Sequence, residues 1–479
     1  MIILAMAAVA SCDFLEPEAD NLRGQDVMDD PAYFCGPLNA AYDALPSMFN
    51  LNMDAMTDNA VVRNYSGNYY RAGIGNMSPN FNPLDCWNSC YSNIRLLNMF
   101  LNRMVLNDEH SYKTPIRFFA INNETDLENN LKMFWRLKGE AYALRAWYYF
   151  ELLRNFAGEG ADGQMLGVPL VGNKVLDQSQ DLNIPRASLA DCIKAIVDDC
   201  DSAVVVGKLP DLYLGTKDVV YNQSLSPHIS GAAAKAIKAK ALLLYASPAY
   251  NKSGETSRWE AAAKAAAAAV NAAGGIFSME EYYFSSFNNT SLTQDNVIFK
   301  GKWVLGNSSL ESDNYPSAIY GSAALNVSQN LVDAFTDAEG YPVSESSVYD
   351  SAKPFANRDA RLDMYVGYDG GKIGTYTIDI SEKGAEHYNP LNAASRSGYY
   401  LKKALRCNQV VCGPSNKKKG TSRACILIGL PELYLMYAEA ANEAWGVNAD
   451  PEGYGFTAQA ALSRILLKDN KKGDLYLKN

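Results

Sequence analysis

The sequence predicts a mainly α-helical fold, in which pairs of helices form a scaffold and long loops leave it on one side. Three observations support this prediction. Apolar residues recur at spacings of three and four residues, as they do on one face of a helix. Two alanine-rich stretches follow each other across a short polar connection. Other long segments are rich in Gly, Ser, Asn and Tyr and contain only short β-like runs.

The first twelve residues predict export and attachment of a lipid. Met1–Ala10 is an unbroken apolar run, too short to span a bilayer, which needs about 20 residues in helical form. Such a run before small residues is typical of a secretory signal, and the letters VASC, ending at Cys12, fit a lipobox. We predict a signal peptide over 1–11, lipidation of Cys12 and an acidic tether over 12–30. No basic residue precedes Arg23, which is unusual for a signal, and a buried N-terminal strand is the alternative.

The clearest helix is predicted around Leu137–Leu152. Gly139, Ala143 and Ala146 form a face of small residues, against which another helix can approach closely. A separate apolar stripe follows the helical period. Its members are Leu137, Ala141, Leu144, Tyr148 and Leu152.

Two alanine-rich helices are predicted to form an antiparallel pair. The first spans 229–247, and the second spans Trp259–Ala273 and stops at Gly274. Their lengths, their alanines and the short turn resemble a tetratricopeptide unit, although no clean period of about 34 residues runs along the chain. Pro431–Gly446 and Phe456–Leu467 are expected to form a further pair.

Composition argues against nucleic-acid binding and against a structural zinc site. The net charge is −10, and no dense stripe of Lys and Arg occurs, whereas a nucleic-acid-binding protein normally has a basic face. The nine cysteines include no CxxC pair, so their spacing does not support a zinc site. We predict no metal and no cofactor.

No catalytic motif emerges from the sequence. A glycosidase needs two carboxylates roughly 5–5.5 Å or 6.5–9.5 Å apart. Glu439 and Glu443 lie four residues apart on one predicted helix face, but a solvated face or a partner arginine explains them more simply. His110, His228 and His387 form no HExxH motif, and no GxSxG elbow occurs. We predict that the protein is not an enzyme.

Six segments of the chain resemble one known family when they are taken in order after the lipobox. They are 26–46 (DVMDDPAYFCGPLNAAYDALP), 86–101 (CWNSCYSNIRLLNMFL), 137–158 (LKGEAYALRAWYYFELLRNFAG), 229–251 (ISGAAAKAIKAKALLLYASPAYN), 357–370 (NRDARLDMYVGYDG) and 431–446 (PELYLMYAEAANEAWG). Together they resemble the SusD/RagB family of outer-membrane nutrient-binding lipoproteins. The resemblance implies a SusD-like domain over 31–467, with loop-rich insertions at about 50–85 and 275–425. The basic tail at 468–479 departs from the family pattern.

The resemblance implies a right-handed α/α superhelix of tetratricopeptide-like helix pairs, with a loop-built binding face and minor β-hairpins. Members of the family capture oligosaccharides, or peptides in one branch, and act as a lid on a SusC-like, TonB-dependent transporter. The implied location is the surface of a Gram-negative outer membrane, held by the lipid. The sequence does not separate a sugar ligand from a peptide, and a non-catalytic scaffold that holds surface proteins together is a third interpretation.

In the family, ligand contacts come largely from loops in the two loop-rich regions. Sugar rings stack on aromatic side chains, and Asn and Arg satisfy their hydroxyl groups. The predicted ligand-binding residues are therefore Tyr65, Tyr69, Tyr70, Arg71, Asn80, Phe81, Trp303, Tyr315 and Tyr320. Trp303 lies in a β-like run, so a core position is its alternative. Trp87, Trp135 and Trp147 lie in helical patterns and are predicted to be core residues.

Overall fold

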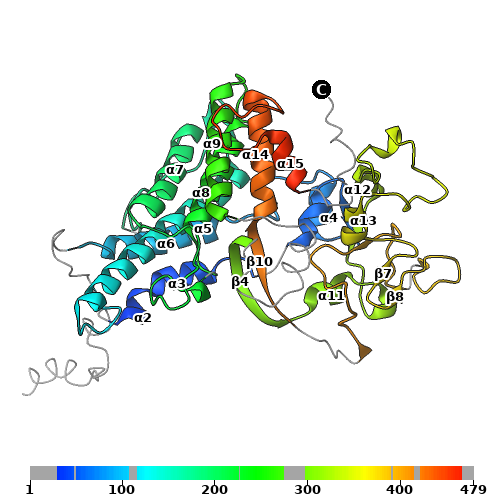
Figure 1. Ribbon diagram of the computed structural model, residues 1–479, viewed down its shortest axis with the longest axis horizontal. Coiled ribbons are helices and arrows are strands. Elements are labelled where there is room, and N and C mark those ends of the chain that lie inside the picture. Colours follow the sequence, from blue (N-terminus) through cyan, green and yellow to red (C-terminus); the bar gives the residue numbers. More distant parts are fainter. Residues whose placement is uncertain are drawn as a thin grey trace, which may run out of the picture.

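The computed structural model describes most of the chain between residues 30 and 465. The described ranges are 30–47, 50–106, 116–177, 179–225, 227–274, 297–389, 392–414 and 421–465, with backbone alone at 303–307 and 421–424. The predicted signal peptide, Cys12, nearly all of the tether and the tail at 468–479 lie outside these ranges and stay predictions. Within them the fold is mainly helical, as predicted (Figure 1). No helix in this part of the chain has the length and hydrophobicity to cross a membrane.

A helical scaffold occupies one side of the molecule. Its helices are α2 (Pro31–Phe34), α3 (Gly36–Asp43), α5 (Trp87–Arg103), α6 (Glu124–Phe156), α7 (Leu189–Val205), α8 (Gly231–Ala246), α9 (Thr256–Ala273), α14 (Leu430–Trp445) and α15 (Ala458–Arg464). From α5 to α9 each helix packs on the next, and then α9 packs on α14 and α14 on α15. The predicted helix pairs are thus α8 with α9 and α14 with α15.

Helix α6 shows how the sequence builds the scaffold core. It begins after Asn123, whose side-chain oxygen accepts a hydrogen bond from a backbone N–H of the first turn at 3.0 Å. The predicted apolar stripe from Leu137 to Leu152 is buried throughout. On the small-residue face, a Cβ on Gly139 would lie 2.9 Å from the carbonyl oxygen of Ala203, so α7 crosses α6 at close range there.

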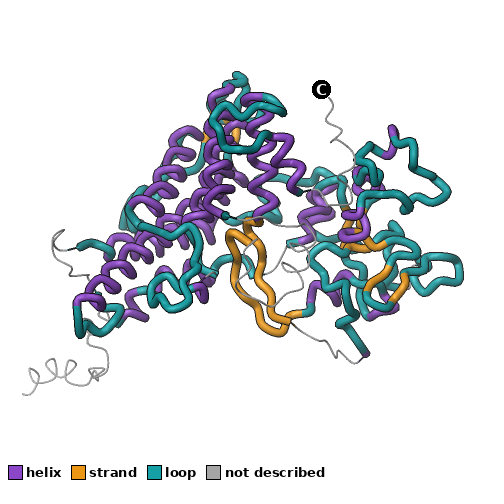
Figure 2. Tube along the Cα trace, in the orientation of Figure 1, coloured by secondary structure: helices purple, strands orange, loops and turns teal. Residues whose placement is uncertain are grey.

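The predicted core tryptophans pack in the scaffold. Trp147 is buried, and Trp87 and Trp135 are half-buried against the same core. Trp147 also meets Phe299 edge-on, with ring centroids 5.2 Å apart. Phe299 belongs to β4 (Val297–Asn307), which pairs antiparallel with β10 (Thr421–Gly429). Figure 2 shows this two-stranded ribbon between the helical scaffold and the loop-rich half of the molecule.

The loop-rich half contains short elements joined by loops. They are η1 (Leu51–Met56), β1 (Ala60–Val62), α4 (Asn68–Gly73), α11 (Ser309–Asn314), η3 (Ser317–Ile319), β5 (Leu325–Val327), α12 (Gln329–Ala334), η4 (Val343–Glu345), α13 (Ala360–Tyr365), β6 (Val366–Gly367), β7 (Lys372–Ile373), β8 (Tyr376–Thr377) and β9 (Tyr400–Leu401). Strands β1 and β5 pair antiparallel, with Ala60 opposite Val327. This pairing places the first loop-rich region against the second.

Short antiparallel pairs account for the other strands of the described chain. On the scaffold side, β2 (Gly158–Glu159) pairs with β3 (Met165–Leu166), and one 3₁₀ turn, η2 (Gln223–Leu225), precedes α8. In the loop-rich half β6 pairs with β9, and β7 pairs with β8. The predicted minor β-hairpins are present as β2–β3 and β7–β8.

Candidate ligand-binding site

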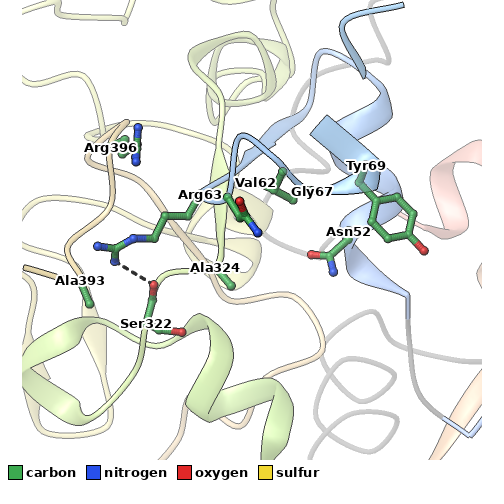
Figure 3. A pocket seen from close by; sticks show the side chains of 10 residues that line it. Asn52, Val62, Arg63, Gly67, Tyr69, Ser322, Ala324, Ala393 and Arg396 are labelled. Carbon is green, nitrogen blue, oxygen red and sulfur yellow. Dashed lines mark hydrogen bonds between the residues drawn. The ribbon is translucent and has the colours of Figure 1, made fainter. Parts of the chain in front are cut away.

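A cavity of about 500 Å³, here called the loop cavity, lies where three segments of the loop-rich half meet. Its polar lining residues are Asn52, Arg63, Asn64, Tyr69, Ser322 and Arg396 (Figure 3). The pairing of β1 with β5 fixes this meeting point. Immediately after β1, the backbone N–H of Arg63 donates to the carbonyl oxygen of Ala324 at 2.8 Å.

The Arg63 side chain joins the three segments. Its guanidinium donates to the carbonyl oxygen of Ser322 at 3.1 Å, drawn as a dashed line in Figure 3. It also donates to the carbonyl oxygen of Asn392. Because a guanidinium has five N–H donors, these two contacts orient Arg63 and leave donors for a ligand.

An aromatic stack stands beside the loop cavity. The rings of Tyr65 and Tyr70 have centroids 4.9 Å apart and are tilted by 34°. The Arg396 guanidinium lies over the Tyr65 ring, 4.1 Å from its centroid, and Tyr65 is 48 % exposed. The Tyr69 hydroxyl oxygen accepts a hydrogen bond from the Asn50 amide at 2.6 Å. Ring surface, amide groups and guanidinium groups are thus available side by side.

A second cavity of about 500 Å³, here called the scaffold groove, lies against α5. Trp87, Tyr91 and Arg95 line it from α5, and Pro169 and Leu182 line it from a facing segment. The Arg95 side chain donates to the carbonyl oxygen of Leu176 at 2.7 Å. None of the residues predicted to bind ligand lines this groove, so the loop cavity is the leading candidate.

Two family models match the chain and together span most of it. The model described as the SusD family matches residues 285–465. The model described as "Starch-binding associating with outer membrane" matches residues 13–243. The chain belongs to the SusD/RagB family. No curated protein sequence matches it.

Solved SusD-like structures share the fold. One from Bacteroides fragilis is 21 % identical, with a TM-score of 0.68 over 94 % of this chain and 81 % of its own. A SusD-like carbohydrate-binding protein from the same species is 20 % identical, with a TM-score of 0.63 over 87 % and 75 %. Surface glycan-binding protein A from Bacteroides uniformis is 14 % identical, with a TM-score of 0.58 over 91 % and 80 %. At these identities the likeness concerns the fold.

In this SusD/RagB family member, the predicted ligand-binding residues are only partly gathered at the loop cavity. Tyr69 lines it, and Tyr65 and Tyr70 stand beside it through the contact with Arg396. Tyr320 is 52 % exposed at the end of η3, two positions before the lining residue Ser322.

Three more of the predicted residues follow α4 or lie at its end. The Arg71 guanidinium lies over the Phe81 ring, 3.9 Å from its centroid. Asn80 is exposed beside them. None of the three lines the loop cavity.

The structure corrects the prediction for Tyr315. Its side chain is fully buried in a cluster that includes Tyr400, and its hydroxyl donates to the carbonyl oxygen of Arg406. Burial raises the pKa of Tyr315 above its usual value. Tyr315 is therefore a core residue that holds the loop-rich half together. Trp303 lies in β4 opposite Ala424, and its side chain is outside the described atoms.

Sequence reasoning missed Asn52, Arg63, Asn64 and Arg396. The first three lie within the loop-rich region at about 50–85, but the residues predicted there are aromatic side chains and the Arg and Asn next to them in the sequence. Arg396 is distant from Tyr65 in the sequence, and no spacing rule joins the two. The pairing of β1 with β5 brings them together, along with contacts from the third segment, in which the backbone N–H of Arg396 donates to the side chain of Asn326 in β5 at 3.1 Å.

The two carboxylates that share a predicted helix face lie elsewhere. Glu439 and Glu443 are both exposed on α14 and line neither cavity. Partial burial and the charge of Glu443 raise the pKa of Glu439, as expected for neighbouring carboxylates on one helix face. No group of three or more His, Cys, Asp and Glu side chains arranged for a metal ion occurs within the described ranges.

Proposed function

We propose that this protein is a cell-surface lipoprotein that binds oligosaccharides in the loop cavity and delivers them to a SusC-like, TonB-dependent transporter. The observation that supports it best is the composition of the cavity and its edge. Tyr65, Tyr70 and Tyr69 offer aromatic surface, on which the C–H faces of sugar rings stack. The side chains of Asn52 and Arg63 offer planar groups that pair with adjacent hydroxyls.

The relatives support a glycan ligand over a peptide. One matching family model is described as starch-binding, and two solved structures with the same fold are described as carbohydrate-binding and glycan-binding. A peptide-binding role keeps the same scaffold and the same cavity. A passive scaffold role requires no ligand in the cavity at all.

Titration calorimetry of the purified full chain against a panel of plant, algal and host glycans tests the proposal. We expect at least one glycan to bind, and Tyr65→Ala or Tyr69→Ala to weaken it roughly tenfold, because each removes a stacking surface. Tyr33→Ala is the matched control, since Tyr33 is 61 % exposed on α2, in the scaffold. If the protein binds peptides and no glycan, the proposed ligand is a peptide instead of a sugar. If it binds neither, the passive scaffold role is favoured.

The lipid anchor has its own test. Cys12→Ala removes the thiol that the lipobox would lipidate, so we expect the variant to leave the membrane fraction when cells are fractionated. Persistent membrane association of the variant would contradict the anchor.

The transporter partnership predicts that the native protein co-purifies with a TonB-dependent barrel from solubilised outer membranes, and a barrel-free preparation would contradict it.

A further inference from the structure

We propose that the loop cavity selects glycans that carry an acidic group, a carboxylate or a sulfate, through Arg63 and Arg396. This inference rests on the proposed function and names the class of glycan. It arises from the charge in the cavity and from how the two guanidinium groups are held.

The loop cavity is basic in an acidic protein. Arg63 and Arg396 line it, and no Asp or Glu is among its lining residues, although the chain has a net charge of −10. Within the described residues, neither arginine forms an ion pair. By contrast, the buried Arg145 pairs with Asp199 at 2.7 Å, and the buried Arg406 pairs with Glu311 at 3.0 Å.

Both guanidinium groups are held in place, and both keep N–H donors and charge available for a ligand. Arg63 is oriented by two neutral carbonyl oxygens, so its full charge remains for a ligand. Arg396 rests on the Tyr65 ring, and its side chain makes no hydrogen bond to the described residues. Stacking uses the flat face of a guanidinium and leaves its N–H edges open. Those edges match the two oxygens of a carboxylate or sulfate.

The stack also explains why the acid would be part of a sugar. The Arg396 guanidinium covers one face of the Tyr65 ring, 4.1 Å from its centroid, and Tyr65 is still 48 % exposed beside it. An acidic sugar has the matching arrangement, with a C–H face for the tyrosine and a carboxylate or sulfate at the edge of the ring. A neutral glycan can contact the tyrosine with its C–H face, but it has no acidic group for the guanidinium, which then stays hydrated.

The test compares glycans that differ only in the acidic group. Polygalacturonate oligosaccharides are paired with their carboxyl-reduced forms, and sulfated galactan oligosaccharides are paired with their desulfated forms. In titrations of the full chain, the acidic member of at least one pair is expected to bind with roughly tenfold or greater affinity than its neutral partner. One charge-assisted hydrogen bond contributes a free energy of this size. The pair that shows the preference distinguishes a carboxylate from a sulfate. Added salt is expected to reduce that preference.

Substitutions of Arg396 test whether the preference for acidic glycans comes from the loop cavity. Arg396→Gln is expected to remove most of the preference, whereas Arg396→Lys retains part of it because the charge remains and the planar fork is lost. Arg154→Gln is the matched control, because it removes the same charge from an exposed position on α6. It is expected to leave the preference unchanged.

Three outcomes overturn the inference, and they differ from one another. Equal affinity within both pairs, with binding still lost in Tyr65→Ala, overturns acid selection and leaves the proposed function standing. Failure of every glycan, neutral or acidic, overturns the proposed function as well. Binding of polyglutamate instead of any glycan assigns the cavity to an acidic peptide.

Discussion

At the scale of single residues, Glu140 connects helix α6 with three other segments of the scaffold. Its buried carboxylate accepts hydrogen bonds from the hydroxyls of Tyr42 at 2.8 Å and Tyr213 at 3.3 Å. It also pairs with Arg136 at 3.2 Å and His228 at 3.1 Å. Burial acts to raise the pKa of Glu140, but the charges of His228 and Arg136 and these hydrogen bonds lower it to about 2. Burial alone would lower the pKa of His228. The charge and the hydrogen bond of Glu140 together outweigh burial, so the pKa of His228 is raised.

These two shifts predict the pH range in which the cluster stabilises the fold. The Glu140 contribution is complete above the ordinary pKa of 4.5 and is lost as the pH falls toward about 2. The His228 contribution is complete below the ordinary pKa of 6.5 and is lost as the pH rises through the raised value in the folded protein. We therefore expect His228→Gln to lower the Tm more at about pH 5.5 than at about pH 9. Thermal unfolding of both proteins across this range measures it, and a Tm difference independent of pH would contradict it.

At the scale of elements, Glu386 holds the turn η3, which leads to Tyr320 and Ser322. Its carboxylate accepts hydrogen bonds from the backbone N–H of Ser317 at 3.2 Å and of Ala318 at 2.8 Å. The hydroxyl of the buried Tyr400 also donates to it, at 2.5 Å. Removing the carboxylate leaves several donors without an acceptor, which is costly in a buried position.

We expect Glu386→Ala to loosen η3 and to weaken glycan binding severalfold while the helical circular dichroism signal is retained. Hydrogen exchange of residues 315–324 measures the first effect, and titration measures the second. Glu382→Ala is the control, since Glu382 is exposed in the same segment. Unchanged exchange in the Glu386 variant would show that the turn holds without it.

The crossing of α6 by the end of α7 gives a second prediction at this scale. A Cβ on Gly207 would lie 2.1 Å from the Cα of Gly139, so Gly207→Ala forces the two backbones apart. We expect a loss of about 1–3 kcal/mol in the free energy of unfolding, as for other overpacked contacts. Urea denaturation measures it against Gly158→Ala, where nothing lies within 4 Å of the added Cβ. Equal stability of the two variants would contradict this account of the crossing.

At the scale of the whole molecule, the two halves differ in how their apolar residues cluster. Those of the helical scaffold form one continuous core, whereas those of the loop-rich half are divided among several small clusters. Regions with fewer buried apolar contacts open at lower free energy. We expect amides of α6, α8 and α9 to exchange slowest, and those of residues 340–389 to exchange earlier. Uniform protection across both halves would contradict this division.

The helical period made the scaffold predictable. The stripe on α6, the alanine-rich pair α8 and α9, and the small-residue face at Gly139 all follow from local spacing. The site was less predictable because it depends on the pairing of β1 with β5, strands of three residues each with no clear pattern. A tyrosine in a Gly- and Ser-rich segment also looks the same whether it is buried, as Tyr315 is, or exposed, as Tyr320 is.

A crystal structure of the protein with its tightest-binding glycan tests the central claim most directly. The account predicts a sugar ring stacked on Tyr65 at the edge of the loop cavity, with its polar groups hydrogen-bonded to Arg63 or Arg396. A glycan bound instead in the scaffold groove, against Trp87 and Tyr91, with the loop cavity empty, would contradict it.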